Sequence, residues 1–249
     1  MKRELKCEGG KIRLYVESAL SEGAQVPSTE NQSHYLLHVM RAKEGDLLSV
    51  FNGRDGEWAA RIARATKRAC VLACETQLDV QRGVPDVWLV FAPIKKTPAD
   101  YVAQKATELG VRALQPVMTR RTIVSRVNLD RLRANAVEAA EQSGRLTVPE
   151  IREPKKLERL LDEWPHERRL VFCDEGGDAR FIGDALKAES DGPFAILSGP
   201  EGGFDPKERA MIRERTFALP VSLGSRILRA DTAALAALAI WQSAKGDWR

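Results

Sequence analysis

Hydrophobic and polar positions follow two different patterns along the chain, and the pattern changes near residue 80. From Lys11 to about Leu78 the apolar runs are short and strand-like, in KIRLYVE, DLLSVFNGRDGEWAARI and ACVLACETQL. Two turn dipeptides, Asn52-Gly53 and Asp55-Gly56, divide the middle run, which predicts a β-hairpin. Only SHYLLHVMRA has helical spacing, with Ser33 as the expected cap. This pattern predicts a small β-rich domain over residues 11–78.

Beyond a polar stretch that contains glycine and proline, DVQRGVPD at residues 79–86, strand-like and helix-like segments alternate. The expected strands are VWLVFAPI, ALQPVM, RRLVFCDE, PFAILSG and ALPVSL, and the expected helices are TPADYVAQKATELG, LDRLRANAVEAAEQSG, DARFIGDALKA, DPKERAMIRERT and a last helix from about Thr232. Alternation of this kind is typical of a parallel sheet covered by helices. We therefore expect a linker at residues 79–86 and an α/β domain over residues 87–249.

The stretch LSGPEGGFDPKE, residues 197–208, is expected to join a buried strand to a helix through a loop that is rich in glycine and therefore exposes its main chain. Asp205 and Pro206 are typical of a helix cap and a first helical position. A ligand could therefore lie against main chain here. The loop fits neither the P-loop pattern nor G-x-G-x-x-G, which disfavours a nucleoside triphosphate or a dinucleotide. A tight connection without a ligand remains an alternative.

A second stretch, VSLGSRILRADTAALAALAIWQ, has the same organisation. We expect a strand that ends at Leu223, a loop with Gly224, and a helix that is capped by Asp231 or Thr232. The loop presents Arg226 and Arg229. The alanine-rich helix is also typical of a packed core or a subunit interface. Two bare loops at the ends of separate strands together predict a pocket.

Composition narrows the function classes further. The chain has 249 residues and a net charge of +4, with five arginines between Arg120 and Arg133 that favour a phosphate-binding strip or a solvated face. No run is long and apolar enough for a membrane span, and the N-terminus lacks a signal-peptide pattern, so we expect a cytosolic protein. His34 and His38 have no evident third ligand, and the four cysteines form no C-x-x-C pair, so we expect no metal and no disulfide framework.

Four ordered motifs resemble those of the RsmE family of SPOUT methyltransferases. They are HYLLHVMR followed by GDLLSVFNG, then QKATELGV, then EAAEQSGR, and finally SGPEGGF with LGSRILRADTAALAAL. The resemblance implies a PUA-like β-barrel, a C-terminal SPOUT domain with a deep trefoil knot, and a homodimer whose active sites lie at the subunit interface. It also implies S-adenosyl-L-methionine as cofactor and N3 of a uridine in 16S ribosomal RNA of the small subunit as target. Residues 1–10 extend beyond the usual start of the family, and Ser225 and Asp231 depart from its usual LGPR and LR-x-E-T-A patterns.

The resemblance assigns roles to individual residues. Arg229 is expected to stabilise charge on the uracil oxygens, and Glu201 is expected to accept a proton or to orient the cofactor. The cofactor-binding set is expected to comprise Leu197, Gly199, Pro200, Glu201, Gly202, Leu223, Gly224, Ile227 and Leu228. The RNA-binding set is expected to comprise Arg13, Arg41, Lys95, Lys96, Arg120, Arg121 and Arg126, with Arg13 or Arg41 as weaker candidates for the catalytic cation.

Two other functions remain open on the sequence. A non-catalytic RNA-binding protein could keep the β-rich domain and a degenerate cofactor fold, but the intact GPEGG and LGSRILR loops disfavour it. An α/β enzyme with a nucleotide cofactor is disfavoured because the fingerprint motifs are absent.

Overall fold

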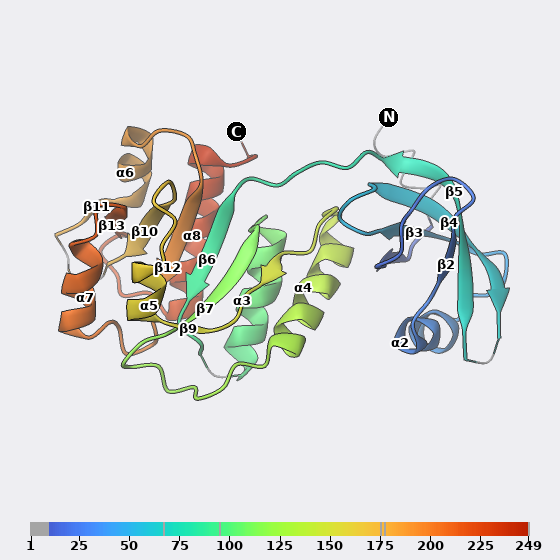
Figure 1. The fold of residues 1–249 in the computed structure, drawn as a ribbon, viewed down its shortest axis with the longest axis horizontal. Helices are drawn as coiled ribbons and strands as arrows, with labels where there is room; N and C mark the ends of the chain where they lie inside the picture. The colour runs from blue at the N-terminus through green and yellow to red at the C-terminus, as the bar shows by residue number, and fades with distance from the viewer. Residues whose placement is uncertain (1–9, 67, 95, 175, 177, 249) are drawn as a thin grey trace. The chain divides into compact units, whose positions relative to one another are not determined.

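The computed structural model describes residues 10–66, 68–94, 96–174, 176 and 178–248, and the chain forms two compact units (Figure 1). The first unit comprises the chain through Gly83 together with Ala140–Val148, and the second comprises the remainder. Residues 80–86, between the two main parts, have no regular secondary structure. Among the described residues no helix is both long and apolar enough to cross a membrane.

The first unit contains a five-stranded sheet in the order β1-β3-β4-β5-β2. Its strands are β1 (Arg13–Tyr15), β2 (Gln25–Pro27), β3 (Leu47–Phe51), β4 (Glu57–Ala65) and β5 (Cys70–Asp79). β1 and β3 are parallel, and the other neighbours are antiparallel. The predicted hairpin is confirmed, because β3 and β4 are consecutive and pair antiparallel. Gly53 and Gly56 in its turn have φ values of 83° and 81° that other residues rarely adopt.

The helix of the first unit begins one turn earlier than expected. α2 (Glu30–His34) continues into a π-helix, η1 (Tyr35–Val39). Ser33 is not the cap; Thr29 is, because its side chain accepts from the Gln32 N–H at 3.2 Å while the Gln32 side chain accepts from the Thr29 N–H at 3.0 Å. Ser33 is buried and donates to the Thr29 carbonyl. The capping box precedes the apolar periodicity, which is why spacing alone placed the start too late.

The capping box predicts a measurable cost for Thr29→Ala. The substitution leaves an N–H of the first turn without its acceptor, and we expect the free energy of unfolding to fall by about 1 kcal/mol. Urea denaturation followed by circular dichroism measures it. Thr29→Ser keeps the acceptor oxygen and serves as the control. Equal stability of the alanine and serine variants would contradict the prediction.

The second unit is built on a parallel sheet in the order β11-β13-β10-β12-β6-β7-β8, with β9 paired to β7. Every pairing in it is parallel, which confirms the predicted α/β class for the described residues. The strands are β6 (Val87–Phe91), β7 (Ala113–Met118), β8 (Glu150–Ile151), β9 (Lys155–Lys156), β10 (Arg169–Cys173), β11 (Arg180–Phe181), β12 (Phe194–Ser198) and β13 (Ala218–Ser222).

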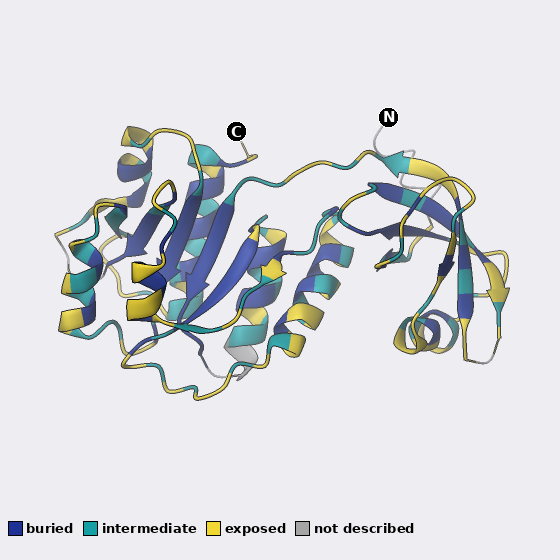
Figure 2. Cartoon of the chain, viewed as in Figure 1, coloured by how far each residue is buried: buried dark blue, intermediate teal, exposed yellow. Residues whose placement is uncertain are grey.

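Helices cover both faces of this sheet, and its central strands are buried (Figure 2). One face packs against α3 (Lys96–Glu108), the first part of α4 (Leu129–Ser143), α6 (Ile182–Ala188) and α8 (Ala230–Lys245). The other face packs against α5 (Leu157–Asp162) and α7 (Pro206–Arg213). The elements α5, β8, β9 and β11 are all short, and the sequence pattern did not predict them.

The last helix begins at Ala230, and neither Asp231 nor Thr232 caps it. Arg229 occupies the cap position without a side-chain hydrogen bond, and its carbonyl accepts from the Ala233 N–H at 2.8 Å. Asp231 instead lies in the first turn, where a carboxylate favours the positive end of the helix dipole. The correction places Arg229 at the junction of the loop and the helix.

Candidate functional site

A cavity of about 690 Å³ lies at the carboxyl ends of β10, β12 and β13. Its volume is within the range of small-molecule sites. The two glycine-containing loops that follow β12 and β13 meet at this cavity, as the sequence predicted. The lining comprises Cys173, Asp174, Ser198, Gly199, Pro200, Glu201, Val221, Ser222, Leu223, Gly224, Ser225, Arg226, Ile227, Leu228, Arg229, Ala230 and Ala233.

The order of the strands explains why these loops meet. β10 lies between β12 and β13 and is parallel to both, so all three carboxyl ends reach the same edge of the sheet. Cys173 and Asp174 thereby become part of the cavity wall. Sequence reasoning missed both residues. The stretch RRLVFCDE was a recognisable strand end, but nothing in the sequence placed it between the other two strands.

The start of α8 is fixed against the end of β12. The hydroxyl of Ser198 donates to the Ala230 carbonyl at 3.1 Å, and Ala230 and Ala233 both line the cavity. The first N–H groups of a helix have no partner within the helix. The cavity therefore has a helix N-terminus and a bare loop on one wall.

Two glycines of the loops have different structural requirements. Gly224 has a φ of 112°, which strains any residue with a side chain, and the space beside it is open. A Cβ at Gly199 would lie 2.6 Å from the Phe204 ring. Gly199 therefore allows Phe204 to pack closely.

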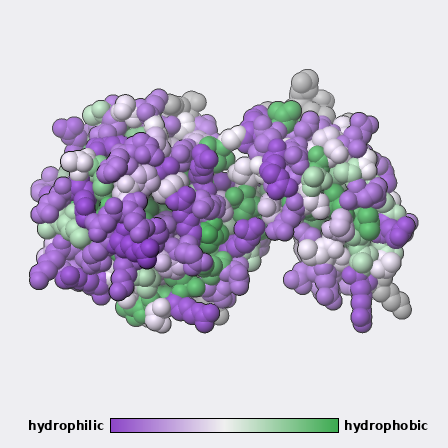
Figure 3. Space-filling model, in the orientation of Figure 1, coloured by the Kyte–Doolittle hydropathy of each residue, from purple (hydrophilic) through white to green (hydrophobic). Residues whose placement is uncertain are grey.

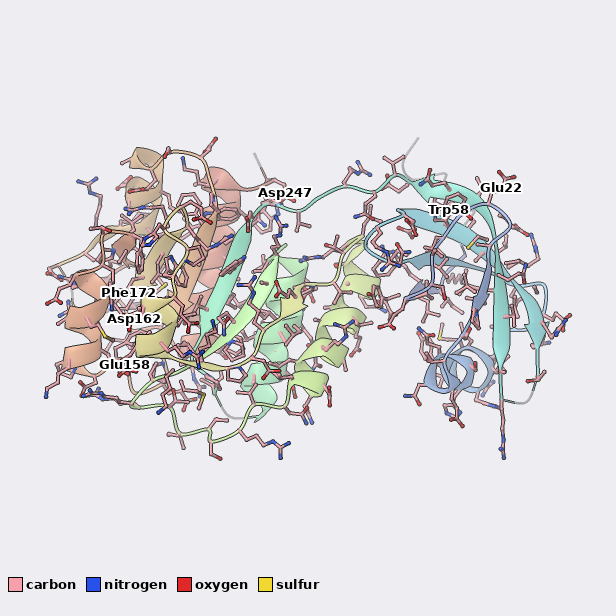
Figure 4. The ribbon with its side chains drawn as sticks, in the orientation of Figure 1. Glu22, Trp58, Glu158, Asp162, Phe172 and Asp247 are labelled. Carbon is pink, nitrogen blue, oxygen red and sulfur yellow. The ribbon has the colours of Figure 1, made fainter. Side chains whose placement is uncertain are left out.

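Most of the expected cofactor-binding residues line the cavity, but Leu197 and Gly202 do not. Leu197 is buried in the core beneath α5 and α7. Gly202 lines a neighbouring cavity of about 220 Å³ on the α7 side, where the Arg121 guanidinium donates to its carbonyl at 2.8 Å. This smaller cavity is lined by Phe172, which is labelled in Figure 4, and by Phe204. The centroids of the two rings are 5.2 Å apart.

Asp174 separates the two cavities and is held by arginines from α7. Its carboxylate is 1% exposed and accepts from Arg209 Nε at 2.7 Å and from Arg213 Nε at 2.6 Å. Burial alone would raise the pKa of Asp174, but the hydrogen bonds from Arg209 and Arg213 outweigh it, and the pKa is lowered. Both arginines also pair with Asp178. The carboxylate is therefore ionised at neutral pH and links α7 to the cavity wall.

This network predicts acid sensitivity that depends on Asp174. The unfolded chain has a carboxyl pKa near 3.8, and the folded protein has a lower one. The ionised group therefore stabilises the fold at pH values above 3.8, and this contribution is lost as the pH falls below 3.8 toward the pKa of the folded protein. We expect Asp174→Asn to lower the free energy of unfolding at pH 7 by about 2 kcal/mol. The difference from the wild type should shrink below pH 3.8. Urea titrations at pH 7 and pH 3.5 measure both values. A difference that is independent of pH would contradict the assignment.

The basic loop between β7 and α4, residues 119–128, is tied to the start of α7. Glu208 is 1% exposed; its carboxylate accepts from the Arg120 N–H at 2.8 Å and from the Asp205 N–H at 3.1 Å. The Arg120 side chain pairs with Asp205 at 3.4 Å. The helix cap predicted at Asp205 is confirmed, and it forms a capping box with Glu208. Arg121 and Arg126 are exposed on the same loop.

Of the two lysines expected to bind RNA, Lys96 begins α3 and Lys95 lies outside the described residues, as does Cys7.

In the first unit Arg13 has a structural role that the sequence did not predict. Its guanidinium donates to Glu57 at 3.0 Å and to the carbonyls of Ala140 and Arg145 at 2.6 and 2.7 Å. The side chain is only 14% exposed, so little of it remains for RNA. Arg41 is exposed and has a φ of 56°, just beyond η1.

Apart from Asp174, three charged side chains at the cavity have no ion-pair partner within the described part of the chain. They are Glu201, Arg226 and Arg229, and all three are exposed. Cys173 carries no charge at neutral pH, because burial raises the pKa of its thiol to about 12. The described residues contain no cluster of side chains that could hold a metal ion.

The cavity residues fit S-adenosylmethionine. A bare main-chain wall supplies N–H and C=O groups for an adenine edge, and the apolar positions Leu223 and Leu228 supply packing surface. Ile227 also lines the cavity, and it is 90% exposed.

Comparison with known proteins identifies the family. Residues 82–242 match the model for the RNA methyltransferase domain, and residues 29–73 match the RNA methyltransferase PUA domain. The ribosomal RNA small subunit methyltransferase E of Rickettsia conorii is 32% identical over 91% of this chain and 93% of its own length. The protein of the same name from Synechocystis is 34% identical over 91% of this chain and 76% of its own.

Solved structures agree with this result. A methyltransferase from Legionella pneumophila with bound SAM has a TM-score of 0.86 at 30% identity, over 95% of this chain and 98% of its own. The ribosomal RNA small subunit methyltransferase E of Neisseria gonorrhoeae, bound to S-adenosyl methionine, has a TM-score of 0.85 at 30% identity, over 96% and 99% of the two chains. The chain therefore belongs to the ribosomal RNA small subunit methyltransferase E family, and it combines a PUA domain with an RNA methyltransferase domain.

Proposed function

We propose that this protein is an S-adenosylmethionine-dependent enzyme that methylates N3 of a uridine in 16S ribosomal RNA. The observation that carries the proposal is the cavity between the GPEGG and LGSRILR loops, which combines bare main chain with an exposed arginine that has no described ion-pair partner. The relatives that this chain resembles are named as small-subunit ribosomal RNA methyltransferases. Two of the similar structures hold the cofactor, and the target atom rests on the motif resemblance.

The chemistry requires a cation and a fixed geometry. When bound, S-adenosylmethionine supplies an electrophilic methyl group on a sulfonium. Loss of the N3 proton from uracil places negative charge on O2 and O4, and a cation at those oxygens stabilises this charge where water is excluded. Arg229 is our candidate for that cation, since it lies where the loop meets the start of α8. Glu201, at the opposite loop, would accept the proton or orient the cofactor. The main-chain walls would hold the reactants in place, which supplies much of the rate.

The remaining expectations are part of the same proposal. A PUA-like barrel over residues 11–78 and the basic loop with Arg120, Arg121 and Arg126 would bind RNA, largely through its phosphates, and binding would weaken as salt rises. The target base would be flipped out to reach the site. We place the enzyme in the cytoplasm, with its ribosomal substrate, and as a homodimer with active sites at the interface.

A trefoil knot in the second unit is also proposed. Two observations support it: β13 pairs with β10 on the side away from β12, and the chain then returns so that Ala230 contacts Ser198 at the end of β12. A return of this kind brings the last segment back past β10. Such threading is rare in proteins, and the family resemblance favours it here.

The test uses small ribosomal subunits from cells that lack this protein. We would incubate them with the purified protein and labelled S-adenosylmethionine, digest the RNA, and analyse nucleosides by mass spectrometry. We expect one labelled N3-methyluridine per subunit. Cofactor binding is measured separately by calorimetry. Binding without methylation of any uridine would refute the substrate, and no binding of S-adenosylmethionine would favour a non-catalytic RNA-binding protein.

A further inference from the structure

A third cavity lies at the carboxyl end of β6, beside the cavity of about 690 Å³ that we propose for the cofactor and call the cofactor cavity. It measures about 160 Å³ and we call it the β6 cavity. Its apolar walls include Phe91, Ile94, Ala99 and Leu132, and its rim includes Arg126 and Asn128. The roles proposed above leave it without a ligand. Figure 3 shows apolar surface along the lower edge of the second unit, over the loop between β7 and α4, which supplies part of this rim.

The β6 cavity and the cofactor cavity open at neighbouring strand ends. Phe91, in the β6 cavity, pairs in register with Ser198, in the cofactor cavity, and the Ala92 N–H donates to the Ser198 carbonyl at 3.1 Å. Neighbouring strands lie about 4.8 Å apart. Phe91 also shares one hydrophobic core with Cys173 on β10, so the two cavities lie on the same face of the sheet. A molecule in the β6 cavity would lie beside one in the cofactor cavity.

The rim of the β6 cavity offers hydrogen-bond donors. Asn128 uses its carbonyl oxygen to accept from the Arg131 N–H at 3.0 Å, and its amide NH2 group makes no bond to the described residues. Arg126 is exposed, with no ion pair to any described residue. Arg131 is held by Asp100, with a distance of 2.6 Å from its Nε to the carboxylate, so this part of the rim is fixed. The side chains of Asn128 and Arg126 therefore offer donors at the rim of a small apolar space. The acidic residue of this rim, Asp100, is already paired with Arg131.

We infer that the β6 cavity binds the uracil ring of the target nucleotide. The inference rests on the proposed function and names the part of the site that selects the base. Uracil is flat and apolar on both faces, with O2 and O4 as acceptors at its edge. The apolar walls match its faces, and the amide of Asn128 or the guanidinium of Arg126 can donate to one of its oxygens, which leaves the other oxygen to Arg229. A base held here has its ring beside the cofactor cavity, as methyl transfer to a ring nitrogen requires.

The test fills the cavity and removes a donor in separate variants. Ala99→Leu adds apolar atoms inside the β6 cavity, and Arg126→Ala removes a donor from an exposed loop, where folding is least affected. We expect each to lower kcat/KM for RNA about 10- to 100-fold. The Kd for S-adenosylmethionine, measured by calorimetry, and the melting temperature should remain those of the wild type. Ile123→Ser is the control, because Ile123 is exposed on the same loop and does not line the cavity.

A second kind of RNA substrate tests whether the β6 cavity binds the target base or a neighbouring base. Short RNAs with an abasic site on either side of the target uridine should leave the defect of Ala99→Leu unchanged. If the defect disappears with an abasic neighbour, the cavity binds that neighbour and the inference is wrong. It is also wrong if the wild type methylates RNA and both variants keep kcat/KM within about twofold. Failure of the wild type to methylate any uridine would instead refute the proposed function.

Discussion

Arg229→Ala should lower kcat for RNA methylation by about 100- to 1,000-fold, the usual cost of removing one group that stabilises developing charge. The side chain is exposed at the mouth of the cofactor cavity and makes no ion pair to the described residues, so the fold does not require its charge. Its carbonyl, which closes the first turn of α8, is retained in the variant. Single-turnover methylation with saturating RNA measures the effect, and calorimetry should give a Kd for S-adenosylmethionine within about threefold of the wild type.

Arg226→Ala is the matched control for this experiment. Arg226 belongs to the same loop, lines the same cavity and is also exposed, but it is not at the start of α8. We expect a much smaller effect on kcat. Arg229→Lys keeps the charge but not the planar geometry and should lie between the wild type and alanine. Full turnover in Arg229→Ala would show that the cation comes from elsewhere, with Arg41 as the next candidate.

Local chemistry made the most informative part of the site predictable. An apolar run followed by GPEGG and then by Asp205-Pro206 can form a strand, a loop and a capped helix with each residue in a favourable conformation. The structure has β12, the loop and α7 in that order, with the capping box formed. The same holds for β13 and α8, because strand and helix periodicities are both clear there.

The missing information was the order of strands in the sheet. β10 lies between β12 and β13, and this places Asp174 in the wall of the cavity and within reach of Arg209 and Arg213 on α7. Strand order depends on the packing of whole elements and has no local signature. The same limit hid the β6 cavity, whose lining comes from the end of β6, two loops, and the helices α3 and α4.

The predicted start of α8 was wrong for a different reason. The sequence offered Asp231 and Thr232 as caps for α8, and both have the right chemistry. The contact between Ser198 and the Ala230 carbonyl fixes the start earlier, at the end of β12. A tertiary contact therefore overrode local preference, and this happened where the helix contributes to the cofactor cavity.

The other end of α8 supports the second large prediction. Trp241 is 2% exposed and packs edge-on against Phe194 at 5.8 Å in the core of the second unit. We expect Trp241→Ala to lower the free energy of unfolding by about 3 to 5 kcal/mol, because it leaves a cavity where the ring was. Urea denaturation followed by circular dichroism measures this loss. Ser243→Ala, at an exposed position on the same helix, is the control and should change stability by less than about 0.5 kcal/mol.

Trp241→Phe separates packing from hydrogen bonding at this position. The indole N–H of Trp241 is buried and has no hydrogen-bond partner among the described residues, so phenylalanine removes an unsatisfied donor and keeps part of the ring. Its cost should therefore stay below about 2 kcal/mol. S-adenosylmethionine at about 100 times its Kd should add about 2.7 kcal/mol to the wild type and to both variants, because the cavity is at the opposite end of the helix. A smaller increment in Trp241→Ala would show that core packing at this end of α8 also positions the first turn, and with it Arg229.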